Sequence, residues 1–185
     1  MSKEIIIRDA TDGDREAIAG VLLDAYSQYS AYLPEPFWLE YRNSILDSVH
    51  GGAPAARIVA EIDQQIAGSM LLFSSSEAAY GRPELSINAP ILRLLAVATA
   101  ARGRGIATLL IREAVRRSRE QGAAALHLHT SDMMASAIQL YEHLGFTRAY
   151  DTDIMNGETL VKGYRLDLLS APAHDVKLPL SATGF

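Results

Sequence analysis

A glycine-rich turn is the segment of this sequence best suited to bind a ligand. It reads Arg102-Gly103-Arg104-Gly105-Ile106-Ala107-Thr108 and follows the apolar run 91–98. At the start of a helix, free backbone N–H groups and the helix dipole together favour an anion. Glycine allows a phosphate to approach the backbone closely. The turn therefore predicts a phosphate site, to which Arg102 and Arg104 can add positive charge.

Two common nucleotide-binding motifs do not fit this turn. A Walker loop requires Gly-Lys-Ser/Thr, whereas Gly105 is followed by Ile106. A dinucleotide fingerprint requires a third glycine where Thr108 stands. It also needs an acidic residue at the tip of the next strand, which ends in His129-Thr130. The phosphate ligand is therefore expected to be neither a nucleoside triphosphate nor a nicotinamide dinucleotide.

The turn resembles the Gln/Arg-x-x-Gly-x-Gly/Ala signature of the GNAT superfamily of N-acetyltransferases, through Arg102-Gly103-Arg104-Gly105-Ile106-Ala107. The resemblance implies that residues 102–108 hold the pyrophosphate of acetyl-CoA. It also implies that the backbone of the preceding strand holds the pantetheine arm. The implied binding residues are Leu95, Ala96, Val97, Arg102, Gly103, Arg104, Gly105, Ile106, Ala107 and Thr108.

A second segment, 137–146, resembles the Ala-x-x-Leu-Tyr-x-x-x-Gly-Phe element of the same superfamily. Helical spacing places Met134, Ala137, Ile138 and Tyr141 on one face, so the tyrosine points inward. Taken alone, such a tyrosine is an ordinary core residue with a satisfied hydroxyl. The resemblance implies a catalytic role for Tyr141, whose phenol would hydrogen-bond or protonate the departing CoA thiolate. Members of the superfamily often have Asn where Met134 stands, so that polar contact with the cofactor arm is not expected.

The acceptor side is less defined. An attacking amine must be neutral, which requires a base or a water path. Many relatives carry Glu on the strand before the turn, where this chain has Arg93. On a regular strand Arg93 shares a face with Leu95 and Val97 and could contact an anionic acceptor group; an ordinary edge arginine is the alternative. Three other residues are candidate bases: Glu61, Glu84 and His129.

Aromatic residues gather around the first two predicted helices, and family analogy makes this region one wall of the acceptor site. Packing of helix faces on the sheet is the plainer interpretation. The polar loop 74–89 is a candidate lid. His127 and His129 share a strand face, but no third ligand has suitable spacing, so no metal is expected. The aromatic residues are Tyr26, Tyr29, Tyr32, Phe37, Trp38 and Tyr41.

These motifs need an α/β scaffold to position them. Residue periodicity and Gly/Pro breaks predict a mixed, mostly antiparallel central sheet with helices on both faces, in a GNAT-like fold. Asp132 is expected to cap the Tyr141 helix and Gly145 to follow its last turn. The domain is expected to span 1–169, followed by a tail at 170–185. The expected strands are 5–8, 57–62, 66–73, 91–98, 124–130, 147–150 and 158–168, and the expected helices are 14–27, 35–47, 101–121 and 133–144.

Composition excludes several functional classes. The 185 residues include no cysteine, which rules out disulfides, thiolate zinc sites and cysteine nucleophiles. The formal net charge of −5 argues against a nucleic-acid partner. No apolar run approaches the ~20 residues that cross a bilayer, and no secretory signal is visible, so a cytoplasmic protein without a membrane partner is expected.

The expected function is acetyl transfer from acetyl-CoA, without a metal, to a primary amine of a small molecule or peptide by direct attack. A non-catalytic acyl-CoA-binding module is one alternative. A protein N-terminal or lysine acetyltransferase is another. The resemblance also allows a homodimer.

Overall fold

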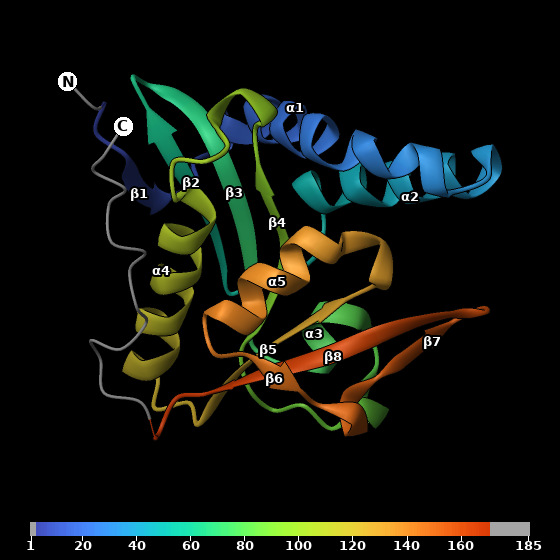
Figure 1. Ribbon diagram of the computed structural model, residues 1–185. Coiled ribbons are helices and arrows are strands. Elements are labelled where there is room, and N and C mark those ends of the chain that lie inside the picture. Colours follow the sequence, from blue (N-terminus) through green and yellow to red (C-terminus); the bar gives the residue numbers. More distant parts are fainter. Residues whose placement is uncertain (1–2, 171–185) are drawn as a thin grey trace, which may run out of the picture.

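A single open sheet forms the centre of the molecule in the computed structural model, which describes residues 3–170 (Figure 1). Its strand order is β1-β2-β3-β4-β5-β8-β6, with β7 paired to β8. The neighbouring pairs are antiparallel except β4 and β5, which are parallel. The predicted mixed, mostly antiparallel sheet is confirmed. The strands are β1 (Ile6–Asp9), β2 (Ala56–Ile62), β3 (Gln65–Phe73), β4 (Ile91–Val97), β5 (Ala125–Thr130), β6 (Thr147–Arg148), β7 (Ile154–Asn156) and β8 (Thr159–Asp167).

Helices cover both faces of this sheet. One apolar cluster joins the first two helices to Val59 and Ala96, and a smaller one joins the third helix to Ile91 on the same face. The other two helices pack on the opposite face with the alternate residues of β2, such as Ile58 and Ala60. The helices are α1 (Arg15–Tyr26), α2 (Glu35–His50), α3 (Ser76–Tyr80), α4 (Ile106–Glu120) and α5 (Ala135–His143).

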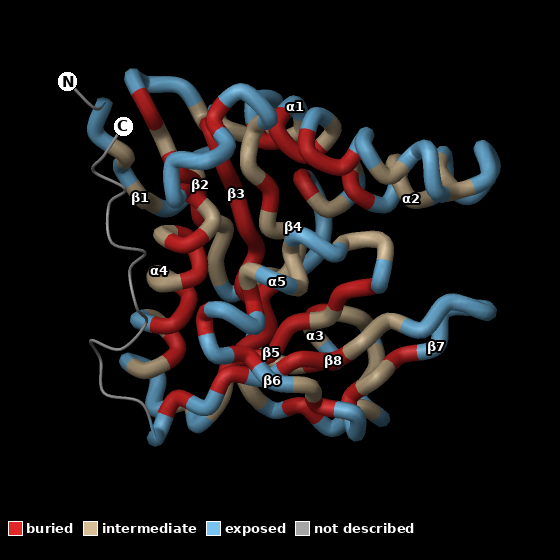
Figure 2. The backbone as a smooth tube through the Cα atoms, viewed as in Figure 1, coloured by how far each residue is buried: buried red, intermediate tan, exposed pale blue. Residues whose placement is uncertain are grey.

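Buried residues follow the central strands and the inner side of α4 (Figure 2). Leu110, Ile111 and Ala114 are fully buried, as their helical spacing predicts. Burying a leucine or isoleucine side chain contributes about 1.5–3 kcal/mol. This apolar stripe fixes the helix that follows the glycine-rich turn against β2, β3 and β5.

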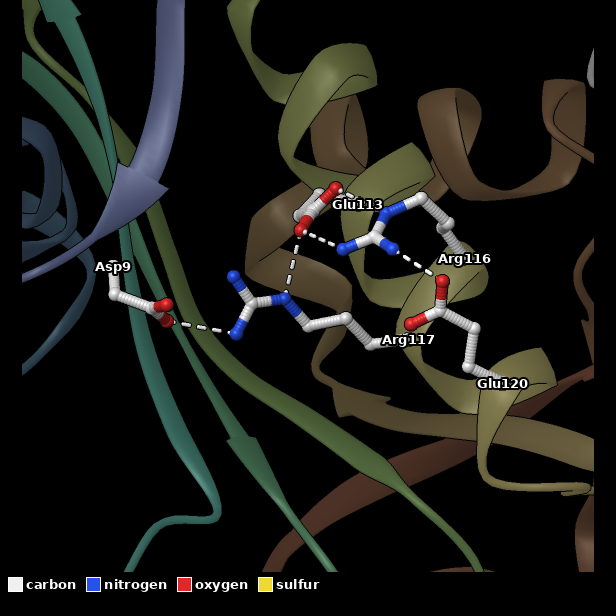
Figure 3. Close-up of polar contacts among 5 residues, drawn as sticks. All are labelled: Asp9, Glu113, Arg116, Arg117 and Glu120. Carbon is white, nitrogen blue, oxygen red and sulfur yellow. Dashed lines mark hydrogen bonds and ion pairs between the residues drawn. The ribbon is translucent and has the colours of Figure 1, made fainter.

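An ion-pair network joins the outer side of α4 to the end of β1 (Figure 3). Arg117 lies 2.7 Å from Asp9 and 2.7 Å from Glu113, measured between nitrogen and oxygen. Arg116 contacts Glu113 at 2.7 Å and Glu120 at 2.5 Å. Hydrogen bonding from Arg116, with help from Arg117, lowers the pKa of Glu113 to about 2. Arg117 therefore links the helix to an edge strand that is remote in sequence.

Three expectations from the sequence need correction. The helix predicted from 101 begins at Ile106, because 99–101 form a 3-10 turn and Gly105 adopts φ +77°. The predicted lid loop contains α3, whose Ala79 is buried in an apolar cluster, so this segment is a packed wall. Asp132 caps no helix, since it lies inside a 3-10 turn and pairs with Lys162 at 2.6 Å. The predicted tail lies outside the described residues from 171 onward.

Strand β4 contains a bulge that the sequence did not reveal. Ser69 pairs with Ala96 and Leu71 pairs with Arg93, so β4 has one more residue than β3 between these pairs. Leu94 takes up the extra length with φ +50°. The bulge shifts the alternation of side chains, and Arg93 lies on the α1–α3 face with its partner Leu71. The prediction that Arg93 shares a face with Leu95 is therefore wrong.

The C-terminus of α5 has the predicted glycine. Gly145 adopts φ +99° and its N–H donates to the carbonyl of Glu142 at 3.0 Å. The N–H of Phe146 donates to the carbonyl of Tyr141, also at 3.0 Å. This pair of bonds is the Schellman motif, which turns the chain back on the helix. Phe146 consequently packs on the ring of Tyr141, with 5.9 Å between centroids.

Candidate active site

A cleft opens where β4 and β5 separate. Their parallel pairing covers Ile91 with His127 and Leu92 with Leu128, and the strands diverge beyond it. The cleft has a volume of about 630 Å³. Its lining comes from α1, the last residues of β4, the glycine-rich turn and α5. Its lining therefore combines residues from helices on both faces of the sheet.

Most of the residues predicted to bind the cofactor line this cleft. Arg104 does not: it is exposed and directs its Nη2 to the carbonyl of Lys3 at 3.5 Å. The positive charge expected inside the cleft is therefore that of Arg102. The lining residues among the predicted set are Leu95, Ala96, Val97, Arg102, Gly103, Gly105, Ile106, Ala107 and Thr108.

The glycine-rich turn has the geometry of an anion site. Gly103 and Gly105 adopt φ +76° and +77°, and a Cβ on either would meet no atom within 4 Å. Gly105 is the N-cap residue of α4 and brings no side chain to cap it. The first helical bond runs from the N–H of Leu109 to the carbonyl of Gly105. The N–H groups of 106–108 thus have no partner in the helix and stand at the cleft, where a phosphate could accept from them.

Two long-range hydrogen bonds hold the approach to this turn. The carboxylate of Asp24 accepts from the N–H of Thr99 at 2.6 Å, and this bond lowers the pKa of Asp24. The hydroxyl of Tyr26 donates to the carbonyl of Leu95 at 3.1 Å, within the bulged part of β4. Both donor–acceptor pairs join α1 to the strand and turn. Sequence reasoning missed them, because neither residue type nor spacing signals a contact across about 70 residues.

Tyr141 has a hydroxyl that the protein leaves unused. Its side chain lines the cleft and is only 7% exposed. Burial raises the pKa of this phenol well above its ordinary value, so it keeps its proton at neutral pH. Within residues 3–170 the hydroxyl has no hydrogen-bond partner, whereas that of Tyr26 is bonded to Leu95. A buried tyrosine hydroxyl usually has a partner, so this one is available to a ligand.

The three candidate bases are engaged elsewhere. Glu61 pairs with Arg8 at 2.7 Å, and Glu84 pairs with Arg82 at 3.8 Å. The His129 ring bonds through Nε2 to the carbonyl of Thr152 at 2.7 Å. A carbonyl can only accept, so Nε2 carries the proton and Nδ1 accepts from the hydroxyl of Tyr80 at 3.0 Å. Burial lowers the pKa of His129. None of the three lines the cleft.

Aromatic rings from α1 and the turn that follows it form one side of the cleft. Tyr26, Tyr29 and Tyr32 line it. Tyr26 packs edge-on against Tyr29 at 5.8 Å and against Tyr41 at 6.2 Å, and Trp38 extends the cluster. Phe37 is 62% exposed and takes no part.

The imidazole of His127 lies in the interior. Its ring is buried, and Nδ1 has no hydrogen-bond partner within the described part of the chain. Burial, followed by the charges of Arg165 and His129, lowers its pKa to about 4. Between residues 3 and 170 no three His, Cys, Asp or Glu side chains are arranged to hold a metal ion. Over the same residues no helix has the length and apolar character needed to cross a membrane.

Comparison with known proteins gives a consistent result. Residues 18–146 match the model of the acetyltransferase (GNAT) family. The chain is 36% identical over 90 residues to rat N-acetyltransferase 8B, covering 49% of this chain and 38% of that protein. It is 30% identical over 122 residues to rat N-acetyltransferase family 8 member 2, covering 60% and 52%. The chain thus spans about half or less of these curated relatives.

Solved structures share the fold. One is the Thermoplasma acidophilum PaiA N-acetyltransferase in complex with coenzyme A, with a TM-score of 0.64 and 16% identity. The similarity covers 86% of this chain and 98% of that one. At this identity the likeness concerns the fold alone.

Proposed function

Since this chain belongs to the acetyltransferase (GNAT) family, we propose that it transfers an acetyl group from acetyl-CoA to a primary amine in the cleft beside β4. One observation carries the proposal: the glycine-rich turn and the unpartnered hydroxyl of Tyr141 line the same cleft. The turn suits a pyrophosphate, and the phenol suits a departing thiolate. The first would hold the acetyl donor, and the second would assist departure of its sulfur.

The donor half of the cleft fits the parts of acetyl-CoA in their order along that molecule. The free N–H groups of 106–108 and the charge of Arg102 would receive the pyrophosphate. Pairing of β4 with β5 stops at Leu92, so backbone groups on that edge of Leu95, Ala96 and Val97 would be left to pair with the amides of the pantetheine arm. Tyr26 holds the Leu95 carbonyl and so fixes the shape of this strand end.

The chemical step is direct attack by the amine nitrogen on the thioester carbonyl. The new C–N bond forms, the C–S bond breaks, and the sulfur leaves with the electron pair. Tyr141 is neutral at physiological pH, so its hydroxyl can donate a hydrogen bond or its proton to that sulfur. Without cysteine in the sequence, a thioester intermediate on the protein is excluded.

The amine would lose its proton to solvent before attack. The candidate carboxylates are ion-paired, and the Nδ1 lone pair of His129 is occupied by Tyr80. An open cleft lets water reach the amine. The aromatic side made by Tyr26, Tyr29 and Tyr32 favours a small molecule as the acceptor.

Calorimetric titration with acetyl-CoA tests the donor site, with NADH as the competing ligand. Gly105→Leu should weaken acetyl-CoA binding at least tenfold, because a side chain would stand where the phosphate approaches the backbone. Gly122→Leu is the matched control, since Gly122 has φ +75° in open space at the other end of α4. Both changes strain the backbone by about 1–2 kcal/mol. Unchanged binding in the Gly105 variant, or a preference for NADH, would contradict the assignment.

Release of free thiol with a panel of primary amines then tests catalysis. Acetyl-CoA binding without thiol release for any amine would indicate a binding module instead of an enzyme. Release with peptide amines alone would redirect the acceptor assignment to proteins.

A further inference from the structure

Arg93 is a half-buried cation without an anionic partner. Its Nη1 donates to the carbonyl of Ala79 at 2.7 Å. The guanidinium carbon lies 4.8 Å from the ring centroid of Tyr80 and 5.8 Å from that of Phe73. Within residues 3–170 no carboxylate lies within ion-pair distance of it. A guanidinium has five N–H donors, so most of its capacity is unused.

Other partly buried arginines have a carboxylate or a second carbonyl partner that Arg93 lacks. Arg8, Arg117 and Arg148 each contact a carboxylate at 2.7 Å. Arg57 lacks a carboxylate, but both of its Nη groups donate to carbonyls at the end of α2 and just beyond it. Burying a charge without a partner is costly, and ring faces satisfy only part of that need. Arg93 thus has N–H donors left over that could bind an anion.

The bulge at Leu94 places this cation on the α1–α3 face of the sheet. Because of the bulge, Arg93 projects to the α1–α3 face, whereas Leu95 and Val97 pack toward α4. Burial raises the pKa of Tyr41 to about 12, and the nearby positive charge of Arg93 acts in the opposite direction. The same opposing effect of Arg93 is present at Tyr26, which lines the cleft. The guanidinium lies on the same face of the sheet as α1, against the rings of Tyr80 and Phe73, and Arg93 is not itself among the residues that line the cleft.

The distance to the reacting centre suits a small bifunctional molecule. Arg93 precedes Leu95 by two residues, which spans roughly 7 Å of strand. Because Leu95 and Tyr141 belong to the α4 side and Arg93 to the opposite face, a substituent of the bound amine would reach Arg93 past the α1 side of the cleft, which Tyr26 lines. A planar carboxylate matches the fork of donors that a guanidinium presents.

We propose that Arg93 binds a carboxylate of the acceptor, so that the substrate is an amino acid or a closely related amino carboxylate. This inference rests on the proposed acetyl transfer and names its substrate class. Arg93 then selects which acceptors bind, and Tyr141 is the residue that donates to the departing sulfur.

Matched acceptor pairs test the proposal by binding. Each pair is an α-amino acid and its primary amide, with aromatic, aliphatic and basic side chains represented. Calorimetric titrations use the protein with and without saturating CoA, so no turnover is needed. For at least one pair, the acid should bind at least tenfold more tightly than the amide. Arg93→Gln should remove that difference and leave the affinity of the amide unchanged, and Arg93→Lys should retain part of it.

Arg82→Gln is the control variant. Arg82 lies just after α3 and its guanidinium pairs with Glu84 at 3.8 Å. It should keep the preference for the acid. An equal loss for both members of a pair in Arg93→Gln would show a structural role only and overturn the proposal. Absence of any acid preference in the unchanged protein would do the same. Failure of the proposed acetyl transfer is seen separately, as an absence of CoA binding or of thiol release.

Discussion

Replacing Tyr141 with Phe should lower turnover and spare both the fold and acetyl-CoA affinity. The hydroxyl has no partner within residues 3–170, so its removal leaves no protein group unsatisfied. The ring keeps its contact with Phe146 at 5.9 Å. The free energy of unfolding should therefore change by less than about 1 kcal/mol. General acid catalysis typically contributes about 10²–10⁴ in rate, or roughly 3–5 kcal/mol of barrier.

Tyr26→Phe provides the structural comparison. Its hydroxyl donates to the carbonyl of Leu95 at 3.1 Å, and removal leaves that carbonyl unpaired. The expected loss of unfolding free energy is about 1–3 kcal/mol, larger than for Tyr141→Phe.

Steady-state thiol release gives kcat and KM for acetyl-CoA, and chemical denaturation gives the stability of both variants. A Tyr141→Phe enzyme with kcat within threefold of the unchanged protein would refute the role of the phenol at the sulfur. A fall in kcat that accompanies an equally large loss of stability would refute the claim that the hydroxyl is free.

Two further predictions concern the scaffold. A Cβ on Gly68 would lie 2.8 Å from Cγ2 of Ile106, so Gly68→Ala should displace the start of α4. The variant should lose about 1–3 kcal/mol of unfolding free energy and bind acetyl-CoA more weakly in calorimetry. Gly20→Ala, with no atom within 4 Å in the middle of α1, should instead stabilise by about 0.5–1 kcal/mol, and equal effects of the two would contradict the clash. Burial lowers the folded-state pKa of His127 to about 4, below the unfolded value of about 6.5. Between these pH values the unfolded chain binds more protons than the folded one, so the free energy of unfolding should fall as the pH drops through that window. Denaturation at pH 7.5 and 4.5 should show a smaller loss in His127→Leu than in the unchanged protein, and equal losses would argue against the buried neutral imidazole.

Local sequence signals predicted the sheet, its long helices and the glycine-rich turn. Helical spacing placed Leu110 and Ile111 in the core, and Gly145 marked the end of α5 correctly, because these features depend on neighbours in sequence. The α3 helix escaped detection because five residues are too few to show a period.

The acceptor side could not be predicted for a different reason. Its shape depends on Leu94, a residue type that rarely adopts positive φ and so gives no signal of a bulge. The same shift in register reversed the predicted face of Arg93. The hydrogen bonds made by the side chains of Asp24 and Tyr26 join residues far apart in sequence, and only the tertiary structure brings these pairs together.

The bulge also determines which face of the sheet each residue of β4 occupies. Because of the surplus residue at Leu94, Arg93 and Ala96 lie on the same face of the sheet although they are three positions apart, whereas Leu95 packs toward α4. Deletion of Leu94 would leave one residue on each strand between the pairs Ser69–Ala96 and Leu71–Arg93, so both pairs could be kept and Arg93 would stay on its present face. Such a deletion would remove the positive-φ kink at Leu94 and leave the segment that leads into the phosphate turn in its present register.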